Sequence, residues 1–149
     1  ARPCSTTVSL IKPIMAADWK QEYSVGHPIL DEQHRGFFAL CKQAEACRKD
    51  RSHEGRQRFH GLLNELVLYA NRHFVTEEGV LALHEYPLLE QHKAEHEAYH
   101  ERLTDFVLQA TFGELDRDGL FDYLTDWWAR HILDSDMKYR DYVQVTHNG

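Results

Sequence analysis

The chain has 149 residues and a mass of 17.5 kDa, a length that fits one domain. Hydrophobic residues make up 42% and charged residues 28%, which is ordinary for a globular protein and argues against disorder or fibrous repeats. Acidic residues outnumber basic ones by 24 to 17, for a formal charge of -7, which disfavours nucleic acid and acidic membrane surfaces as partners. Uninterrupted apolar runs span only a few residues, far below the about 20 that membrane insertion needs.

The N-terminal residues and the cysteines give two further expectations, one about the segment before the domain and one about the cellular compartment. Residues 1–17 are predicted to be a tail or linker, because the apolar stretch at 8–11 is too short for a signal sequence. A cloning remnant, a processed end and the tail of a preceding domain all fit this segment. The cysteines are odd in number and form no CxxC pair: Cys4, Cys41 and Cys47. They are typical of reduced thiols and indicate a cytoplasmic location.

Helical periodicity dominates the rest of the chain. Apolar residues recur at intervals of three and four in the segments 28–49, 54–83, 87–110 and 116–143. The intervening breaks at 50–55, 84–87 and 111–118 contain Gly or Pro. Because short connections force neighbouring helices to run antiparallel, we predict an all-α, up-down-up-down four-helix bundle with an extended N-terminal arm.

Polar residues interrupt the apolar stripe of every predicted helix. They are His34 on the first, His73 and Glu77 on the second, His92 and His96 on the third, and His131 with Asp136 on the fourth. On the fourth helix, spacing alone leaves Asp134 as an alternative to Asp136. A buried unpaired carboxylate or imidazole costs several kcal/mol, and a metal centre shared by all four helices removes this cost.

A single histidine pair would be weak support for such a centre. The chain contains 11 histidines, and His96 and His100 have the same spacing as His92 and His96. The prediction therefore depends on convergence of all four helices. Trp127 and Trp128 are predicted to be bundle core, whether or not they also wall a pocket.

Several motifs together resemble the hemerythrin family in its bacterial form. The similarity covers about residues 18–143 and is carried by W-x3-Y-x-V-G (19–26), ILDEQH (29–34), HFVTEE (73–78), EYP (85–87), H-x3-H (92–96) and W-W-x2-H-I-x3-D-x2-Y (127–139). The resemblance implies that residues 18–149 form a hemerythrin-like di-iron domain that binds O2. Only this resemblance selects Asp136 over Asp134.

The resemblance also implies a role for each site residue. The terminal ligands of one iron would be His92, His96 and His131; those of the other, which keeps an open position, would be His34 and His73. Glu77 and Asp136 would bridge the two Fe ions together with an oxo or hydroxo group. Trp127, Trp128 and Ile132 would line the O2 pocket. Two residues depart from the usual pattern: Trp128 replaces a smaller Leu, and His27, which we expect at the surface, replaces an aliphatic residue.

The function implied by this resemblance is reversible O2 binding without catalysis, with nitric oxide as an alternative ligand. The domain would serve as an oxygen carrier or as the O2- or redox-sensing part of a protein with a fused or partner signalling domain. The alternative is a ferritin-like di-iron oxidase or ferroxidase. That class needs Glu-x-x-His on two helices, whereas this chain offers only Glu97-x-x-His100.

Overall fold

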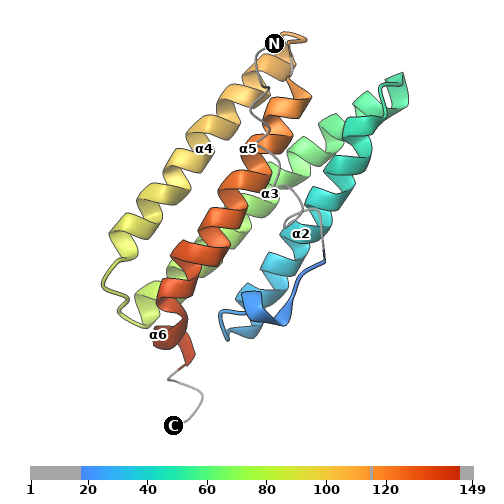
Figure 1. Ribbon diagram of the computed structural model, residues 1–149. Coiled ribbons are helices and arrows are strands. Elements are labelled where there is room, and N and C mark those ends of the chain that lie inside the picture. Colours follow the sequence, from blue (N-terminus) through green and yellow to red (C-terminus); the bar gives the residue numbers. More distant parts are fainter. Residues whose placement is uncertain (1–17, 115, 145–149) are drawn as a thin grey trace, which may run out of the picture.

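Four long helices make up most of the molecule (Figure 1). The computed structural model describes residues 18–114 and 116–144, in which no strand occurs. The helices are α2 (Pro28–Lys49), α3 (His53–Leu83), α4 (Leu89–Thr111) and α5 (Arg117–Arg130). A short 3-10 helix, η1 (Gln21–Tyr23), precedes them, and α5 continues into η2 (His131–Ser135), η3 (Asp136–Tyr139) and α6 (Arg140–Gln144). Neighbouring helices run antiparallel, which confirms the predicted four-helix bundle; the tail predicted for residues 1–17 lies outside the described residues.

Two helical segments differ from the sequence prediction by more than one residue. The third helix begins at Leu89 rather than at residue 87, because a turn precedes it in which Glu85 has a φ of 54° and the Tyr86 amide donates to the Leu81 carbonyl at 3.0 Å. The fourth helical segment is not one α-helix, since a π-helical turn (η2) and a 3-10 turn (η3) interrupt it after Arg130. None of the described helices is long and apolar enough to cross a membrane.

Side chains cap the helix N-termini in three places. Ser52 accepts a hydrogen bond from the Gly55 amide at 3.1 Å at the start of α3, and Asp116 caps α5 in the same way. At the start of α2, Nδ1 of His27 accepts from the Leu30 amide at a long 3.5 Å. His27, which we expected at the surface, is therefore a half-buried N-cap.

The segment before α2 packs against α6. Tyr23 and Val25 are buried, and Gly26 between this segment and α2 has a φ of 79°. A Cβ atom at this glycine would overlap the side chain of Gln144 in α6. Its positive φ favours glycine at this position, and a larger residue would also displace the Gln144 side chain.

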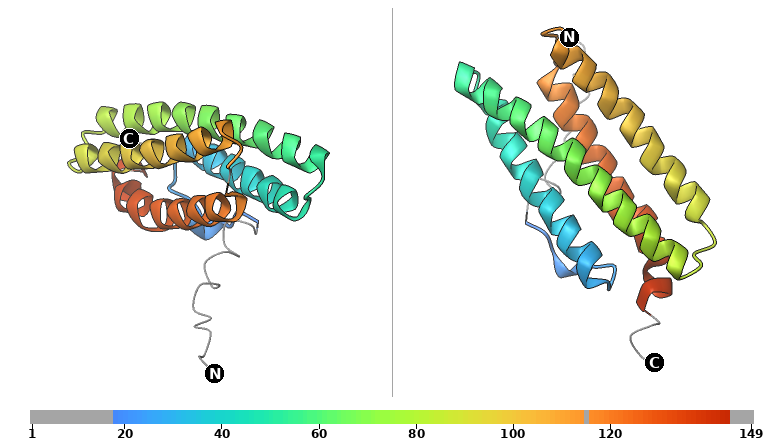
Figure 2. Two further views of the ribbon diagram at one scale, coloured as in Figure 1. Left: turned by 90° about the horizontal axis from the view of Figure 1, so that it is seen from above. Right: turned by 180° about the vertical axis from the view of Figure 1, so that it is seen from behind.

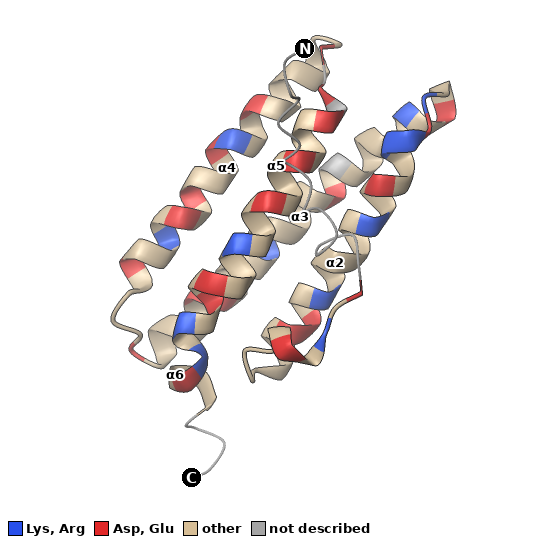
Figure 3. Cartoon of the chain, viewed as in Figure 1, with Lys and Arg blue, Asp and Glu red and all other residues tan. Residues whose placement is uncertain are grey.

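The apolar core consists of two clusters separated along the bundle axis. The larger cluster contains Phe74 and Ile132, and the smaller contains Leu81 and Tyr139. Phe74 and Ile132 precede Glu77 and Asp136 by about one helical turn, and Leu81 and Tyr139 follow these carboxylates by about one turn. The layer that holds the two carboxylates therefore lies between the two apolar clusters. On the outer faces, acidic and basic residues are interspersed along the four long helices (Figure 3).

Candidate metal centre

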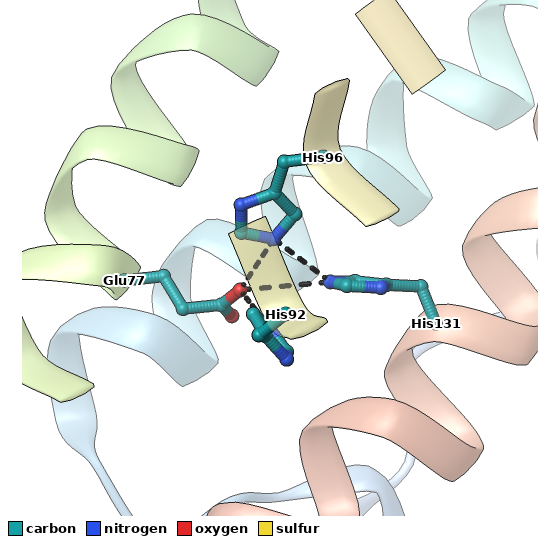
Figure 4. A group of neighbouring side chains, drawn as sticks. All are labelled: Glu77, His92, His96 and His131. Atoms are coloured by element: carbon teal, nitrogen blue, oxygen red, sulfur yellow. Dashed lines mark hydrogen bonds and ion pairs between the residues drawn. The ribbon is translucent and has the colours of Figure 1, made fainter. Parts of the chain in front are cut away.

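The polar residues predicted from the sequence meet at one level of the bundle, and all are at most 3% exposed. In the described part of the chain they form two groups, in each of which potential ligand atoms lie within 4.8 Å of one another. One group is Glu77, His92, His96 and His131 (Figure 4); the other is His34, His73, Glu77 and Asp136. Four helical segments far apart in sequence thus supply a single cluster.

Glu77 belongs to both groups. Its Oε1 lies 2.5 Å from Nε2 of His92 and 2.9 Å from Nε2 of His96. Its Oε2 lies 3.3 Å from Nε2 of His73 and 3.8 Å from Nε2 of His34. One carboxylate therefore presents a separate oxygen to each group.

Asp136 is arranged in the same way. Its Oδ1 lies 3.0 Å from Nε2 of His131 and 3.2 Å from Nε2 of His92, and its Oδ2 lies 3.0 Å from Nε2 of His34. The two carboxylates are thus positioned between the groups with one oxygen toward each, which is the arrangement of bridging ligands in a dinuclear centre.

The π-helical turn η2 explains how Asp136 reaches this position. In an α-helix, a residue five positions after His131 would lie about 140° around the axis from it. Instead the Asp136 amide donates to the carbonyl of His131, which places both side chains on the inner face. Asp134, the alternative that spacing left open, is 76% exposed and lies near Lys138.

The electrostatics of this layer fit a cation. Burial raises the pKa of Glu77, but the charge of His73 and a hydrogen bond from His131 outweigh it and hold that pKa well below its ordinary range. Burial likewise lowers the pKa of His34, yet Asp136 and Glu77 raise it to about 9. Burial and the charge of Glu77 raise the pKa of Asp136, but His131 and His34 outweigh them and hold that pKa below its ordinary range. Both carboxylates are therefore charged, and each lies at ion-pair distance from imidazole nitrogens.

Several of these buried atoms make no hydrogen bond of ordinary geometry. They are both ring nitrogens of His34, Nε2 of His73 and both carboxylate oxygens of Asp136. Orphaned polar atoms are costly in a protein interior, whereas imidazole nitrogens and carboxylate oxygens are good ligands for divalent iron. The residues present therefore fit a metal centre.

Comparison with known proteins decides the family. Residues 25–143 match the model of the hemerythrin HHE cation-binding domain, which is most of the chain. The chain belongs to the hemerythrin family. Hemerythrins are O2-binding, non-haem iron proteins.

Relatives and solved structures agree with this assignment. A bacteriohemerythrin of Clostridium acetobutylicum is 28% identical over 126 residues, covering 83% of this chain and 98% of its own. One of Stenotrophomonas maltophilia is 27% identical (85% and 81% covered), and a hemerythrin-like protein of Naegleria gruberi is 29% identical (83% and 90% covered). A crystal structure of wild-type hemerythrin has a TM-score of 0.75 at 23% identity, covering 86% of this chain and 98% of the other. At that identity the last similarity shows the fold alone.

Polar side chains behind the histidines orient their rings. Nδ1 of His131 lies 2.9 Å from Glu95, which also accepts from Ser135, and Nδ1 of His96 lies 3.0 Å from Glu78. An imidazole that donates from Nδ1 presents the lone pair of Nε2 to the centre. Two histidines of the first group are therefore backed by carboxylates.

The two histidines of the second group, His34 and His73, have no carboxylate beside Nδ1 among the residues that the structure describes. Nδ1 of His73 lies 2.7 Å from the amide oxygen of Gln33, and Nδ1 of His34 has no hydrogen-bond partner in the described part of the chain. Tyr139 donates a hydrogen bond of 2.8 Å to Oε2 of Glu77, the oxygen that faces this group. The negative charge behind the ligands is thus concentrated on the first group.

Sequence reasoning missed these backing residues: Gln33, Glu78, Glu95, Ser135 and Tyr139. All of them except Tyr139 are adjacent in sequence to a site residue. Adjacency on a helix turns a side chain by about 100°, so it does not show which neighbouring helix that side chain meets. The backing partners emerge only when the helices are packed.

Aromatic rings cover one side of the centre. Trp128 is fully buried and stacks on Phe37 with ring centroids 3.6 Å apart. Its ring centroid lies 5.8 Å from that of His73 and 6.0 Å from that of His131, so it borders both groups. Trp127 is half-buried and stacks on His131 at 4.5 Å.

The one Glu-x-x-His motif, formed by Glu97 and His100, lies apart from the centre. Glu97 is exposed, and neither it nor His100 belongs to either group of potential ligands found among the described residues. The ring of His100 instead packs edge-on against Phe74 at 5.1 Å. The described structure therefore contains a histidine-rich pair of groups rather than the Glu-rich ligand set of ferritin-like oxidases.

Proposed function

We propose that the seven clustered residues hold two iron ions and that the protein binds O2 reversibly at one of them. His92, His96 and His131 would be the terminal ligands of the first ion, and His34 and His73 those of the second. The observation that supports this proposal most directly is that Glu77 and Asp136 each direct one carboxylate oxygen to each group of ligands. That arrangement supports two ions sharing both carboxylates rather than one ion or none.

The two groups differ in the number of donors that they offer. The first supplies three imidazole nitrogens and one oxygen from each carboxylate, and the second supplies two nitrogens and two oxygens. With one imidazole donor fewer, the second group would leave room for O2 at the ion that it holds. When bound, the iron pair supplies the electrons that reversible O2 binding requires.

The surrounding side chains would favour binding over further chemistry. Trp128 and Ile132 are fully buried beside the centre, and with Trp127 we propose that they line the O2 pocket. Such a wall excludes water and protons, whose entry promotes irreversible oxidation. The protein would therefore act without catalytic turnover.

Two substitutions test the assignment. Glu77→Ala removes a carboxylate shared by both groups, and His131→Ala removes a ligand of the first group only. Each should lower the iron content and abolish the change in optical spectrum on aeration, while circular dichroism still shows a helical bundle. His100→Ala is the control, because this histidine has the H-x3-H spacing from His96 but lies outside both groups. Full iron content in Glu77→Ala would refute the assignment.

Reversible O2 binding at this site would serve either of two physiological roles, oxygen transport or oxygen sensing. A carrier and a sensing domain would share the site and differ in what the full gene product attaches to it, so the coding sequence distinguishes them. Nitric oxide has the size of O2 and should compete for the same position. Buried free thiols at Cys41 and Cys47 support a cytoplasmic, reducing setting.

A further inference from the structure

The outer face of α3 carries apolar side chains that nothing in the described structure covers. Leu68 is 64% exposed and Val75 is 73% exposed. They lie seven residues apart, so they share one side of the helix. In the view from behind, α3 lies nearest the viewer, and no other helix passes in front of it (Figure 2, right). Gly61 and Gly79 continue the stripe, and a Cβ atom added at either would meet nothing within 4 Å.

Two charged residues flank Leu68 on this stripe. Glu65 and Arg72 are exposed, and neither forms an ion pair with another described residue. Seven residues correspond to about 10.5 Å along the helix, which is too far for them to pair with each other. They stand at nearly equal distances on either side of Leu68, with opposite charge.

We propose that this face binds the same face of a second copy, with the two α3 helices antiparallel about a two-fold axis at Leu68. A two-fold axis repeats every contact, so the interface must be complementary to itself. With the axis at Leu68, Glu65 of each copy faces Arg72 of the other, and Val75 of each faces Gly61 of the other. The dimer would thus contain two Glu65–Arg72 ion pairs and two contacts between Val75 and Gly61.

A competing register is less favourable. An axis midway between Leu68 and Val75 would pair these two side chains, but it would bring the two copies of Arg72 together. Like charges facing each other across helices are destabilising. The charge pattern therefore selects the register centred on Leu68.

The surface beside the stripe leaves room for a partner helix. A hollow of about 450 Å³ runs between α2 and α3, and Gly36, Ala39 and Leu68 are among its lining residues. The small side chain of Ala39, which is exposed, leaves the hollow accessible to a second helix, whereas the space beside Gly36 is filled by Tyr69 of α3. Only Leu68 and Val75 contribute large apolar area, so the interface is smaller than the about 1,600 Å² of a standard stable complex. We expect a weak dimer, with a dissociation constant of order 100 µM.

The test is the oligomeric state of the full chain, measured by analytical ultracentrifugation up to about 1 mM, ten times the expected dissociation constant. Glu65→Arg and Arg72→Glu each leave like charges facing across the axis and should raise the dissociation constant at least about tenfold. The double variant Glu65→Arg/Arg72→Glu recreates both pairs and should restore dimerisation. Metal content is measured in parallel and should not change, because the stripe lies opposite the metal centre.

A hydrophobic substitution supplies the matched control. Leu68→Glu should abolish association, whereas Leu108→Glu should not, although Leu108 on α4 is also 53% exposed. Circular dichroism establishes that each variant remains helical. A wild-type chain that stays monomeric throughout, a double variant that fails to recover, or equal loss in Leu108→Glu would overturn the proposal.

Discussion

Replacing Glu95 by Gln keeps the size of the side chain but removes its negative charge from behind His131. Glu95 accepts from Nδ1 of His131 at 2.9 Å and from Ser135 at 2.6 Å. The hydrogen bond from His131 lowers the pKa of Glu95 to about 2, so the carboxylate is charged at neutral pH. Losing such a partner costs ten- to hundredfold in metal affinity, or about 1.4–2.7 kcal/mol. Because the Glu95 side chain is 42% exposed and water screens its charge, we expect the lower end, about tenfold.

The measurement is a titration of metal-free protein with Co²⁺ against a competing chelator, followed by the absorption of the bound ion. Two binding steps are expected in the wild type. Glu95→Gln should weaken the step that fills the group containing His131 and leave the other unchanged. Glu97→Gln, an exposed carboxylate on the same helix, should alter neither. If Glu95→Gln bound Co²⁺ with the affinity of the wild type, or weakened both binding steps equally, the proposed effect of Glu95 on His131 would be wrong.

Three further predictions concern the bundle around the centre. Trp128→Leu should lower the free energy of unfolding in urea by about 2–3 kcal/mol, since it leaves a cavity at a fully buried position; a loss under 1 kcal/mol would contradict the packing described. Without metal, burial lowers the pKa values of His34 and His92, but Asp136 and Glu77 raise each to about 9. Protonation of these histidines therefore stabilises the metal-free fold fully below about pH 6.5, and this stability is lost as the pH rises through 9, which urea unfolding at pH 6 and pH 9 would detect. Gly26→Ala should lower the melting temperature because of its φ of 79°, whereas Gly79→Ala on exposed helix should raise stability by about 0.5–1 kcal/mol; equal effects would show that the backbone conformation at Gly26 is not required.

Much of the fold is legible in the sequence because helix periodicity reports directly which side of each helix is buried. The apolar stripes predicted four helices, and Pro28 does begin α2. Because His34, His73 and His131 interrupt these stripes, they were expected to meet in the interior, and the structure places them there. The physical basis is local: a residue three or four positions from a buried neighbour shares its face.

Other features depend on how the helices pack against one another. Spacing left Asp134 and Asp136 as alternatives, and the π-helical turn places Asp136 inside and Asp134 in solvent. The backing of His131 by Glu95 and of His73 by Gln33 joins different helices. The stripe pattern of one helix carries no information about its rotation and height relative to the next, nor about a local unwinding that adds a residue to a turn. Those quantities are set by packing of the whole bundle, and they decide which atoms face one another at the centre.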